Sequence, residues 1–266
     1  MIVAFVFILG LFIGSFLNVV ILRLHRQESF VKGASKCLFC KHRLYPKDLV
    51  PLFSFLALKG RCRYCKKKFS NQYPLVELVT GLAFVLVFLK IVPSLGLTSV
   101  SALQFLHLLD WWIIVGFLII IFVYDLKYYL ILDKVVWPVI VLALFANLFL
   151  GFSILNLVFG AVIGGGFFLL QFVMSKGRWI GGGDIRLGIL MGVILGWPHI
   201  LTALFISYVL GSFISIFLLL AKRKEWSDKV PFGTFLALGT FITMLWGPLL
   251  VTWYVSLFVH STFGGY

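Results

Sequence analysis

Long apolar runs separated by short polar segments dominate the chain. A helix of about 20 apolar residues is long enough to cross the ~30 Å hydrocarbon core of a bilayer. Eight runs of this kind, some of them shorter, are predicted as helices at residues 1–22, 74–92, 106–131, 134–150, 154–174, 184–196, 199–221 and 233–258. The pattern therefore predicts an all-α polytopic membrane protein with about eight transmembrane helices.

The composition supports this fold class. The 266 residues are 62% apolar and 12% charged, with a mean hydropathy of +1.10, whereas soluble domains have roughly 25% charged residues. The net charge of +14 raises the question of a nucleic-acid partner. However, 13 of the 23 Lys and Arg residues lie within residues 23–68, between two apolar runs. We therefore expect this basic loop to lie against anionic lipid headgroups, and we expect no nucleic acid partner.

The positions of the cations also predict an orientation. If the N-terminus lies outside the cytoplasm, every Lys and Arg except Lys90 falls on the cytoplasmic side, including Lys222, Arg223, Lys224 and Lys229. Residues 1–22 carry no charge, unlike the basic start of a signal peptide, so they are predicted to be a retained helix. The predicted domains are a first helix (1–22), a basic cytoplasmic loop (23–73), a seven-helix membrane core (74–258) and a short tail (259–266).

The four cysteines of the chain all lie in the basic loop, as two C-x2-C pairs with 21 residues between them: Cys37 and Cys40, then Cys62 and Cys65. Two such pairs can form a closed tetrahedral zinc site, and neighbouring cations favour the thiolate form. Disulfides are the alternative, but a cytoplasmic loop lies in a reducing compartment. The spacing predicts structural zinc, because four protein ligands leave no position for a catalytic water.

Two acidic residues lie where a membrane protein rarely has them. Asp125 follows the interfacial Trp111 by 14 residues, or about 21 Å of helix, which places it inside the cytoplasmic half of the bilayer. Asp184 follows three glycines at the predicted start of a short helix on the same side. Simpler explanations are a pairing of Asp125 with Lys127 and a helix cap for Asp184, while Asp133 is expected to cap the next helix.

Two neighbouring carboxyl groups can act as an aspartic protease. One is ionised and takes a proton from water, while the other is protonated and donates to the scissile carbonyl. Asp125 and Asp184 are 59 residues apart, and no helix periodicity brings them together. The sequence alone leaves this pairing as a hypothesis.

Further motifs resemble the bacterial type IV prepilin peptidases, also called leader peptidases with N-methyltransferase activity. The resemblance covers nearly the whole chain and includes the paired C-x2-C loop, Asp125-Leu126 and residues 14–20 (GSFLNVV), 60–65 (GRCRYC), 73–78 (YPLVEL), 181–187 (GGGDIRL) and 231–239 (PFGTFLALG). Two positions differ from the family pattern. Leu132 replaces a common Pro, and Arg186 replaces a Lys with the charge kept.

The resemblance implies a bifunctional enzyme of the bacterial inner membrane, with Asp125 and Asp184 as catalytic residues. Such an enzyme cleaves the basic leader of type IV prepilin or pseudopilin precursors at the cytoplasmic face. It then methylates the new N-terminal residue with S-adenosylmethionine, a function linked to the zinc loop. Glu77 is the acid that could help to deprotonate the amine, and Asn18 or Arg23 could hold donor or substrate groups. Simpler roles for these three are a helix-start charge, interhelical packing and snorkelling to the headgroups.

Three other functions remain open from the sequence. A transporter could use Asp125 and Asp184 as binding carboxylates, and residues 181–183 as a break in a helix. A membrane-anchored zinc module could dock partners without any catalysis. An aspartic leader peptidase could also lack methyltransferase activity, although the relatives of that kind usually lack the cysteine loop. The natural substrates and the oligomeric state do not follow from the sequence.

Overall fold

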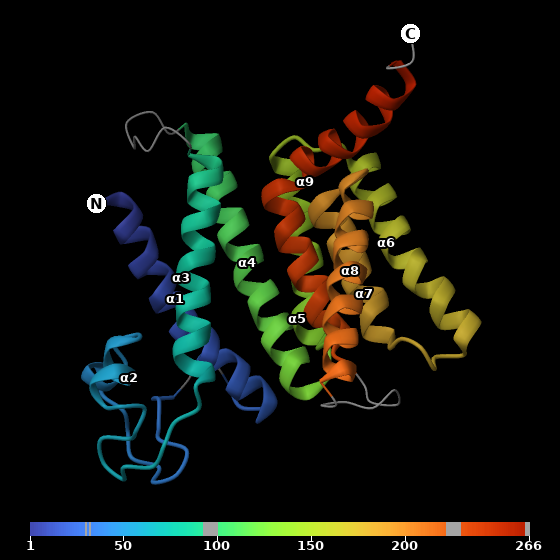
Figure 1. Ribbon diagram of the computed structural model, residues 1–266. Helices are drawn as coiled ribbons and strands as arrows, with labels where there is room; N and C mark the ends of the chain where they lie inside the picture. The colour runs from blue at the N-terminus through green and yellow to red at the C-terminus, as the bar shows by residue number, and fades with distance from the viewer. Residues whose placement is uncertain (30, 32, 93–100, 222–229, 264–266) are drawn as a thin grey trace. The chain divides into compact units, whose positions relative to one another are not determined.

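The computed structural model describes residues 1–29, 31, 33–92, 101–221 and 230–263 (Figure 1). Within these residues the regular structure is helical, apart from two isolated β-bridges. The chain forms two compact units, Met1–Ile120 and Ile121–Tyr266, and the boundary falls inside helix α4 (Ala102–Tyr128). The predicted all-α fold is therefore confirmed.

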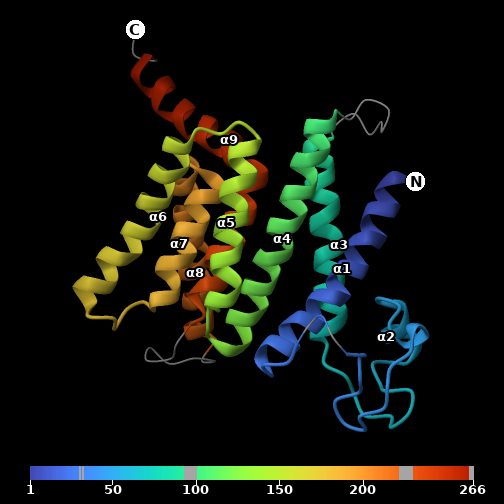
Figure 2. The same ribbon diagram turned by 180° about the vertical axis from the view of Figure 1, so that it is seen from behind.

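Unit 1 contains a helical group and the cysteine loop. Helices α1 (Ile2–His25) and α3 (Gln72–Ile91) lie side by side in both views (Figures 1 and 2), and the loop between them lies at one end. The loop includes the short helices η1 (Pro46–Asp48) and α2 (Phe53–Ala57). Trp112 of α4 joins this unit by donating its indole N–H to the Phe84 carbonyl, 3.1 Å away, and stacking on the Phe84 ring.

Glycines let the backbones of α1 and α3 touch. A Cβ added to Gly10 would lie 2.7 Å from Cα of Gly81, and one added to Gly14 would lie 2.7 Å from Cα of Glu77. Side chains at these positions would push the helices apart, as at the small-residue contacts of other membrane helices. Gly10 and Gly14 therefore serve the close packing of α1 on α3.

Unit 2 contains the end of α4 and five further helices: α5 (Asp133–Phe149), α6 (Ile154–Ser175), α7 (Gly182–Leu195), α8 (His199–Leu220) and α9 (Phe232–Phe263). Helix α7 packs against α5, α6 and α9, and α8 packs on α9. The Asn147 side chain of α5 donates to the Val193 carbonyl of α7 at 2.8 Å. Helix α7 therefore holds a central place in this unit.

Each predicted apolar run is a helix, but the count of eight complete spans is not confirmed. Among the described residues, six helices are long and apolar enough to cross a membrane: α1, α3, α4, α6, α8 and α9. Helices α5 and α7 have 17 and 14 residues, or about 26 and 21 Å, which is less than the ~30 Å hydrocarbon core. Helix α9 continues to Phe263, beyond the predicted end at 258, and the last tail residues, 264–266, lie outside the described part.

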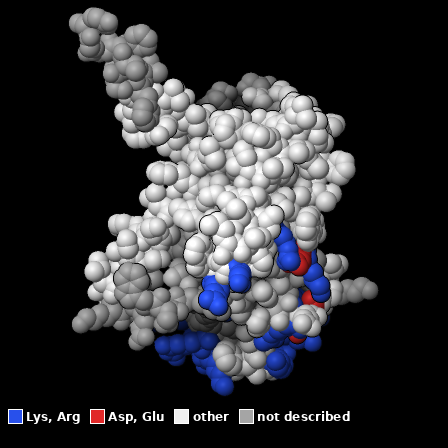
Figure 3. All heavy atoms as spheres, turned by 90° about the vertical axis from the view of Figure 1, so that its right-hand side faces the viewer, with Lys and Arg blue, Asp and Glu red and all other residues white. Residues whose placement is uncertain are grey.

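Charged residues are absent from most of the face shown in Figure 3 and gather toward one end of it. A face with few charges is expected for a membrane protein, because a charge in the hydrocarbon core is costly. Lys32, Lys222, Arg223, Lys224 and Lys229, which entered the predicted orientation, lie outside the described residues.

The contact between α6 and α7 gives a test of the fold with a control on the same helix. A Cβ on Gly164 would overlap the backbone carbonyl of Gly188, whereas a Cβ on Gly166 would meet open space. We expect Gly164→Ala to destabilise the protein by about 1–3 kcal/mol. Gly166→Ala should be neutral or stabilising by up to about 1 kcal/mol, because alanine favours helix. Thermal unfolding in detergent measures both, and equal effects would contradict this packing.

Candidate functional site

Asp125 lies in the last turn of α4 and is 5% exposed. Its Oδ2 accepts hydrogen bonds from the backbone N–H of Thr234 at 2.8 Å and from the Thr234 hydroxyl at 3.2 Å. Thr234 is the third residue of α9, where the backbone N–H groups have no partner within the helix. The start of α9 therefore supplies the donors that a buried carboxylate needs. The ammonium of Lys127, a predicted partner of Asp125, lies 5.2 Å from the ring centre of Tyr128.

Asp184 lies in the first turn of α7 and is 8% exposed. Its Oδ2 accepts a hydrogen bond of 3.0 Å from the N–H of Gly181, the residue that precedes the helix. The predicted position of Asp184 at a glycine-rich helix start is confirmed. The carboxylate also caps the start of α7, so the helix-cap role considered from the sequence applies to Asp184 as well.

The side chain of Ile131 links the surroundings of the two aspartates. A Cβ on Gly183, the neighbour of Asp184, would lie 3.3 Å from Cδ1 of Ile131. A Cβ on Gly233 would lie 2.8 Å from the same atom and 3.0 Å from Oδ2 of Asp125. The fold therefore brings both carboxylates to one region of unit 2, despite their separation in sequence.

Asp133 does not cap α5 with its side chain as expected. The residue that precedes the helix is Leu132, which has no side-chain hydrogen bond, and Asp133 is the first helical residue. Its carboxylate forms an ion pair with Arg186 of α7, two residues after Asp184. Asp133 thus pairs with a cation of another helix and does not cap its own. This ion pair joins α5 to α7 through Arg186.

The four cysteines form one cluster in unit 1. Their Sγ atoms all lie within 4.8 Å of one another, and the Sγ atoms of Cys37 and Cys65 are 3.9 Å apart. A tetrahedral zinc with Zn–S bonds of ~2.3 Å requires sulfurs about 3.8 Å apart. None of the four is in a disulfide. The sulfur positions therefore fit a zinc ion that closes the loop.

The surroundings of Cys37 also favour metal binding. Burial raises the pKa of this thiol, but hydrogen bonds from the backbone N–H groups of Cys40 and Phe39 and from neighbouring thiols outweigh burial and lower the pKa to about 7. A thiol with such a pKa is readily deprotonated, and the thiolate is the metal-binding form.

The two cysteine pairs belong to a repeated structure with an offset of 25 residues. In each turn, the residue after the second cysteine donates its backbone N–H to the carbonyl of the first cysteine at 3.0 Å. This residue, Lys41 in one turn and Lys66 in the other, has a positive φ. The β-bridges Lys36–Arg43 and Arg61–Lys68 follow the same offset. This repeat was not predicted above. It is visible in the sequence, because both segments have a cation, a C-x2-C pair and then three basic residues.

Contacts between the two turns repeat in the same way. The Tyr64 ring lies on the His42 ring with centres 3.7 Å apart, and the Lys67 ammonium lies 5.1 Å from the centre of the Phe39 ring. In each case, the aromatic residue inside one C-x2-C pair contacts the residue that lies two positions after the second cysteine of the other pair. The turns are thus related by a local pseudo-twofold arrangement around the sulfur cluster.

Asp48 ties the middle of the loop to the second turn. Burial raises the pKa of this carboxyl, but hydrogen bonds from the Arg63 guanidinium at 2.6 Å, the Tyr45 backbone N–H and the Tyr64 hydroxyl outweigh burial and hold the pKa below its ordinary value. Asp48 is therefore ionised at neutral pH, and it fixes η1 against the second pair of cysteines.

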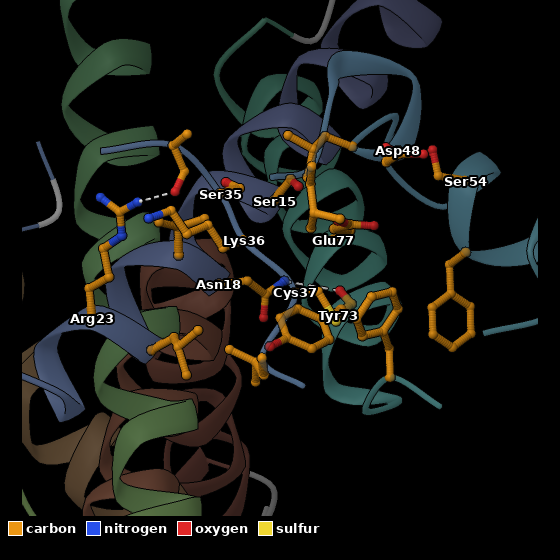
Figure 4. Close-up of a pocket in the computed structure, with 18 of the residues that line it drawn as sticks. Ser15, Asn18, Arg23, Ser35, Lys36, Cys37, Asp48, Ser54, Tyr73 and Glu77 are labelled. Carbon is orange, nitrogen blue, oxygen red and sulfur yellow. Dashed lines mark hydrogen bonds between the residues drawn. The ribbon is translucent and has the colours of Figure 1, made fainter. Parts of the chain in front are cut away.

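Asn18, Arg23 and Glu77, the three predicted methyl-transfer residues, line a single cavity of about 600 Å³ in unit 1 (Figure 4). The cavity lies between α1, α3 and the cysteine loop, and its size falls within the ~300–1,000 Å³ of small-molecule sites. The structure therefore gathers residues that lie up to 59 positions apart in sequence.

Each of these three side chains also holds backbone. The Asn18 amide donates to the carbonyls of Gly14 and Tyr73. The Arg23 guanidinium donates to the carbonyls of Ser29, Gly33 and Ala34, which folds the start of the loop over the end of α1. Glu77 Oε2 accepts a 2.8 Å hydrogen bond from the N–H of Leu52. All three side chains frame the cavity. The sequence did not predict the Leu52 N–H as the partner of Glu77 or the Thr234 N–H as the partner of Asp125.

Two carboxylates near one end of a helical membrane unit define a candidate membrane aspartic peptidase, and comparisons with known proteins agree with this class. A family model described as "Bacterial Peptidase A24 N-terminal domain" matches residues 8–91, and "Type IV leader peptidase family" matches residues 112–216. The comparison with solved structures gives no match.

The chain is also similar to curated proteins named "Prepilin leader peptidase/N-methyltransferase". The protein of Aeromonas hydrophila is 32% identical over 96% of this chain and 94% of its own length. Those of Pseudomonas aeruginosa and Bacillus subtilis are 31% and 29% identical, over 94% of this chain and 92% and 97% of their own lengths. The chain belongs to the type IV leader peptidase family.

The cysteine cluster predicts a bound metal. We expect about one zinc per chain in protein purified without chelators and under reducing conditions, and a loss of most of it in Cys37→Ser, because three sulfurs hold zinc less tightly than four. Mass-spectrometric metal analysis measures the ratio. Ser35→Ala, two residues before Cys37, is the control and should keep its zinc. Wild-type protein without zinc would contradict the site.

Proposed function

We propose that Asp125 and Asp184 are the catalytic pair of an aspartic leader peptidase. The observation that supports this most directly is their convergence: the Ile131 side chain lies against Gly183, next to Asp184 in the first turn of α7, and against Gly233, whose added Cβ would lie 3.0 Å from Oδ2 of Asp125. Each is more than nine-tenths buried and held by a backbone N–H, so its position is fixed before substrate binds.

Two such groups can divide the chemistry of hydrolysis. The ionised carboxylate takes a proton from a water molecule as the water oxygen attacks the scissile carbonyl carbon, and the protonated partner donates to the carbonyl oxygen. Breakdown of the intermediate breaks the C–N bond, and the leaving nitrogen takes a proton. A shared proton suits this pair, because two negative charges in a low-dielectric site repel each other.

The substrates follow from the family. The relatives are named prepilin leader peptidases, and the chain matches them over almost its full length. The substrates are therefore type IV prepilins or pseudopilins, cut between a basic leader and an apolar segment. Asp125 and Asp184 lie at helix ends and not at helix centres. Water and an unwound peptide reach helix ends more easily.

The second activity is methylation of the new N-terminus, which we assign to the cavity of unit 1 with Asn18, Arg23 and Glu77 in its walls. S-adenosylmethionine would supply the methyl group. The cavity fits such a molecule in size, and rings of Phe55, Phe69 and Tyr73 line it. Aromatic faces of this kind can stack on adenine and attract a sulfonium.

The family match favours this function over the alternatives. The match to residues 8–91 covers the cysteine loop with the helices on either side of it, which supports the bifunctional enzyme over a peptidase without methyltransferase activity. None of the relatives reported above is named as a transporter or as a docking module. Zinc would be structural, because four cysteine sulfurs complete its coordination.

Substitution of either aspartate tests the peptidase. We expect Asp125→Asn and Asp184→Asn each to lower cleavage of a prepilin peptide by at least about 100-fold, because neither amide can exchange the required proton. Both variants should still methylate a synthetic peptide with the mature N-terminus. Product masses after incubation with S-adenosylmethionine separate the two reactions.

The control for this experiment is Asp133→Asn, which removes an exposed carboxylate that pairs with Arg186. Since exposed ion pairs stabilise proteins by only about 0–1 kcal/mol, this variant should keep cleavage within about tenfold of wild type. Full cleavage by either Asp125→Asn or Asp184→Asn would remove that residue from the mechanism.

The protein is a multi-pass protein of the bacterial inner membrane, as its six apolar helices and its relatives indicate. We propose that its N-terminus lies outside the cytoplasm, which places the cysteine loop, Asp125 and Asp184 on the cytoplasmic side. The basic loop would then face the anionic inner leaflet, where each cation stabilises membrane contact by roughly 1 kcal/mol.

Protease access tests the orientation. Trypsin added to sealed right-side-out vesicles should leave the loop intact, and the same protease should cut after loop lysines and arginines in inverted vesicles. Mass spectrometry of the fragments identifies the cut sites. Cleavage of the loop in right-side-out vesicles would reverse the proposed topology.

A further inference from the structure

Glu77 makes a contact that a proton acceptor for methyl transfer would not need. It lies in the second turn of α3, is 7% exposed and directs Oε2 to the backbone N–H of Leu52, 2.8 Å away in the cysteine loop. The backbone of α1 lies directly against this residue, because a Cβ added to Gly14 would be 2.7 Å from the Glu77 Cα. Glu77 thus joins α3, which packs on α1, to the loop, and it lies among the cavity-lining residues labelled in Figure 4.

The partner of Glu77 has an unusual backbone. Leu52 has φ 57° and ψ −49°, and the N–H of Phe53 bonds to the carbonyl of Pro51 at 2.6 Å. This is a γ-turn with a positive central φ, a rare and strained conformation for a residue with a side chain. Such strain persists where the surrounding contacts hold it in place, and it is often found at functional sites.

The turn directs the Leu52 N–H away from the loop and toward the membrane helices. Leu52 immediately precedes α2, so its N–H would otherwise have no partner within that helix. A charged carboxylate is the strongest acceptor available for such a donor. Leu52 and Glu77 both line the cavity, so the bond joins two of its walls directly.

We propose that Glu77 is a positioning residue, which docks the cysteine loop onto α1 and α3 by accepting the Leu52 N–H and so closes the methyl-donor cavity. This inference rests on the proposed methyl-transfer function of that cavity. It assigns Glu77 a hydrogen-bond acceptor role rather than a proton-acceptor role. A zinc ion held by the four cysteines would fold the loop itself, and Glu77 fixes the folded loop against the helices.

The two roles predict different results for Glu77→Gln and Glu77→Ala. A glutamine oxygen can still accept the Leu52 N–H, so Glu77→Gln should methylate a mature-form peptide within about fivefold of wild type. Glu77→Ala leaves the donor without a partner and should lose about 10- to 100-fold, mainly through a higher KM for S-adenosylmethionine. Asp133→Asn, which removes an exposed carboxylate of unit 2 that does not line the cavity, is the control and should resemble wild type.

A second measurement is independent of activity. Amide hydrogen exchange in residues 50–54, followed by mass spectrometry of the detergent-solubilised protein, should be faster in Glu77→Ala and unchanged in Glu77→Gln. Zinc content should stay at the wild-type ratio in both variants, because the sulfur cluster does not include Glu77. Prepilin cleavage, which we assign to unit 2, should also persist in both variants. Its persistence would show that the variants fold.

Equal loss of methylation in Glu77→Gln and Glu77→Ala would overturn the proposal and identify Glu77 as a proton acceptor. Unchanged exchange of residues 50–54 in Glu77→Ala would also overturn it, because the loop would then be docked by other contacts. If the wild-type protein methylates no peptide, the methyl-transfer function itself fails. The exchange experiment still decides whether Glu77 docks the loop.

Discussion

A buried carboxylate must be hydrogen-bonded, and in a bundle of membrane helices nearly every backbone N–H is already used within its own helix. The free donors lie at helix starts. All three carboxylates assigned to function here meet such a donor: Asp125 bonds to the third residue of α9, Asp184 to the residue before α7, and Glu77 to the residue before α2. The need for these donors determines which helix ends must meet, and so it fixes the position of each reactive group.

This constraint explains why both proposed sites lie at helix ends. Asp125 is in the last turn of α4 and Asp184 in the first turn of α7, and each bonds to backbone that leads into a helix. The arrangement satisfies the carboxylates, and at the proposed membrane face it would leave them within reach of the water that hydrolysis needs. A site at the middle of the helices would have neither free backbone donors nor an easy route for water. The chemistry and the folding requirement therefore select the same region.

The sequence predicts elements well and contacts between distant elements poorly. Apolar runs locate every long helix because each run is a local property, and the C-x2-C spacing identifies the sulfur cluster for the same reason. Depth in the bilayer singles out Asp125, and the glycines before Asp184 predict a helix start. Thr234 and Leu52 carry no comparable signal, since they act through backbone N–H groups whose partners are 109 and 25 residues away. Asp133 was misassigned because its ion pair with Arg186 depends on how α5 and α7 pack.

The cysteine loop shows how a short polar segment can form a wall of a binding cavity. The described residues between 26 and 71 include few large buried side chains, so their apolar core is too small to fold the loop. The two C-x2-C turns instead meet at one sulfur cluster, and the ring and cation contacts between them repeat with the same 25-residue offset. A metal at this cluster would fold the loop as a rigid piece, and a rigid piece needs only a few bonds to dock. Arg23 fixes one edge of the loop to α1, and Glu77 fixes another to α3. The cavity is therefore defined by the fixed helices on one side and by a metal-folded segment on the other.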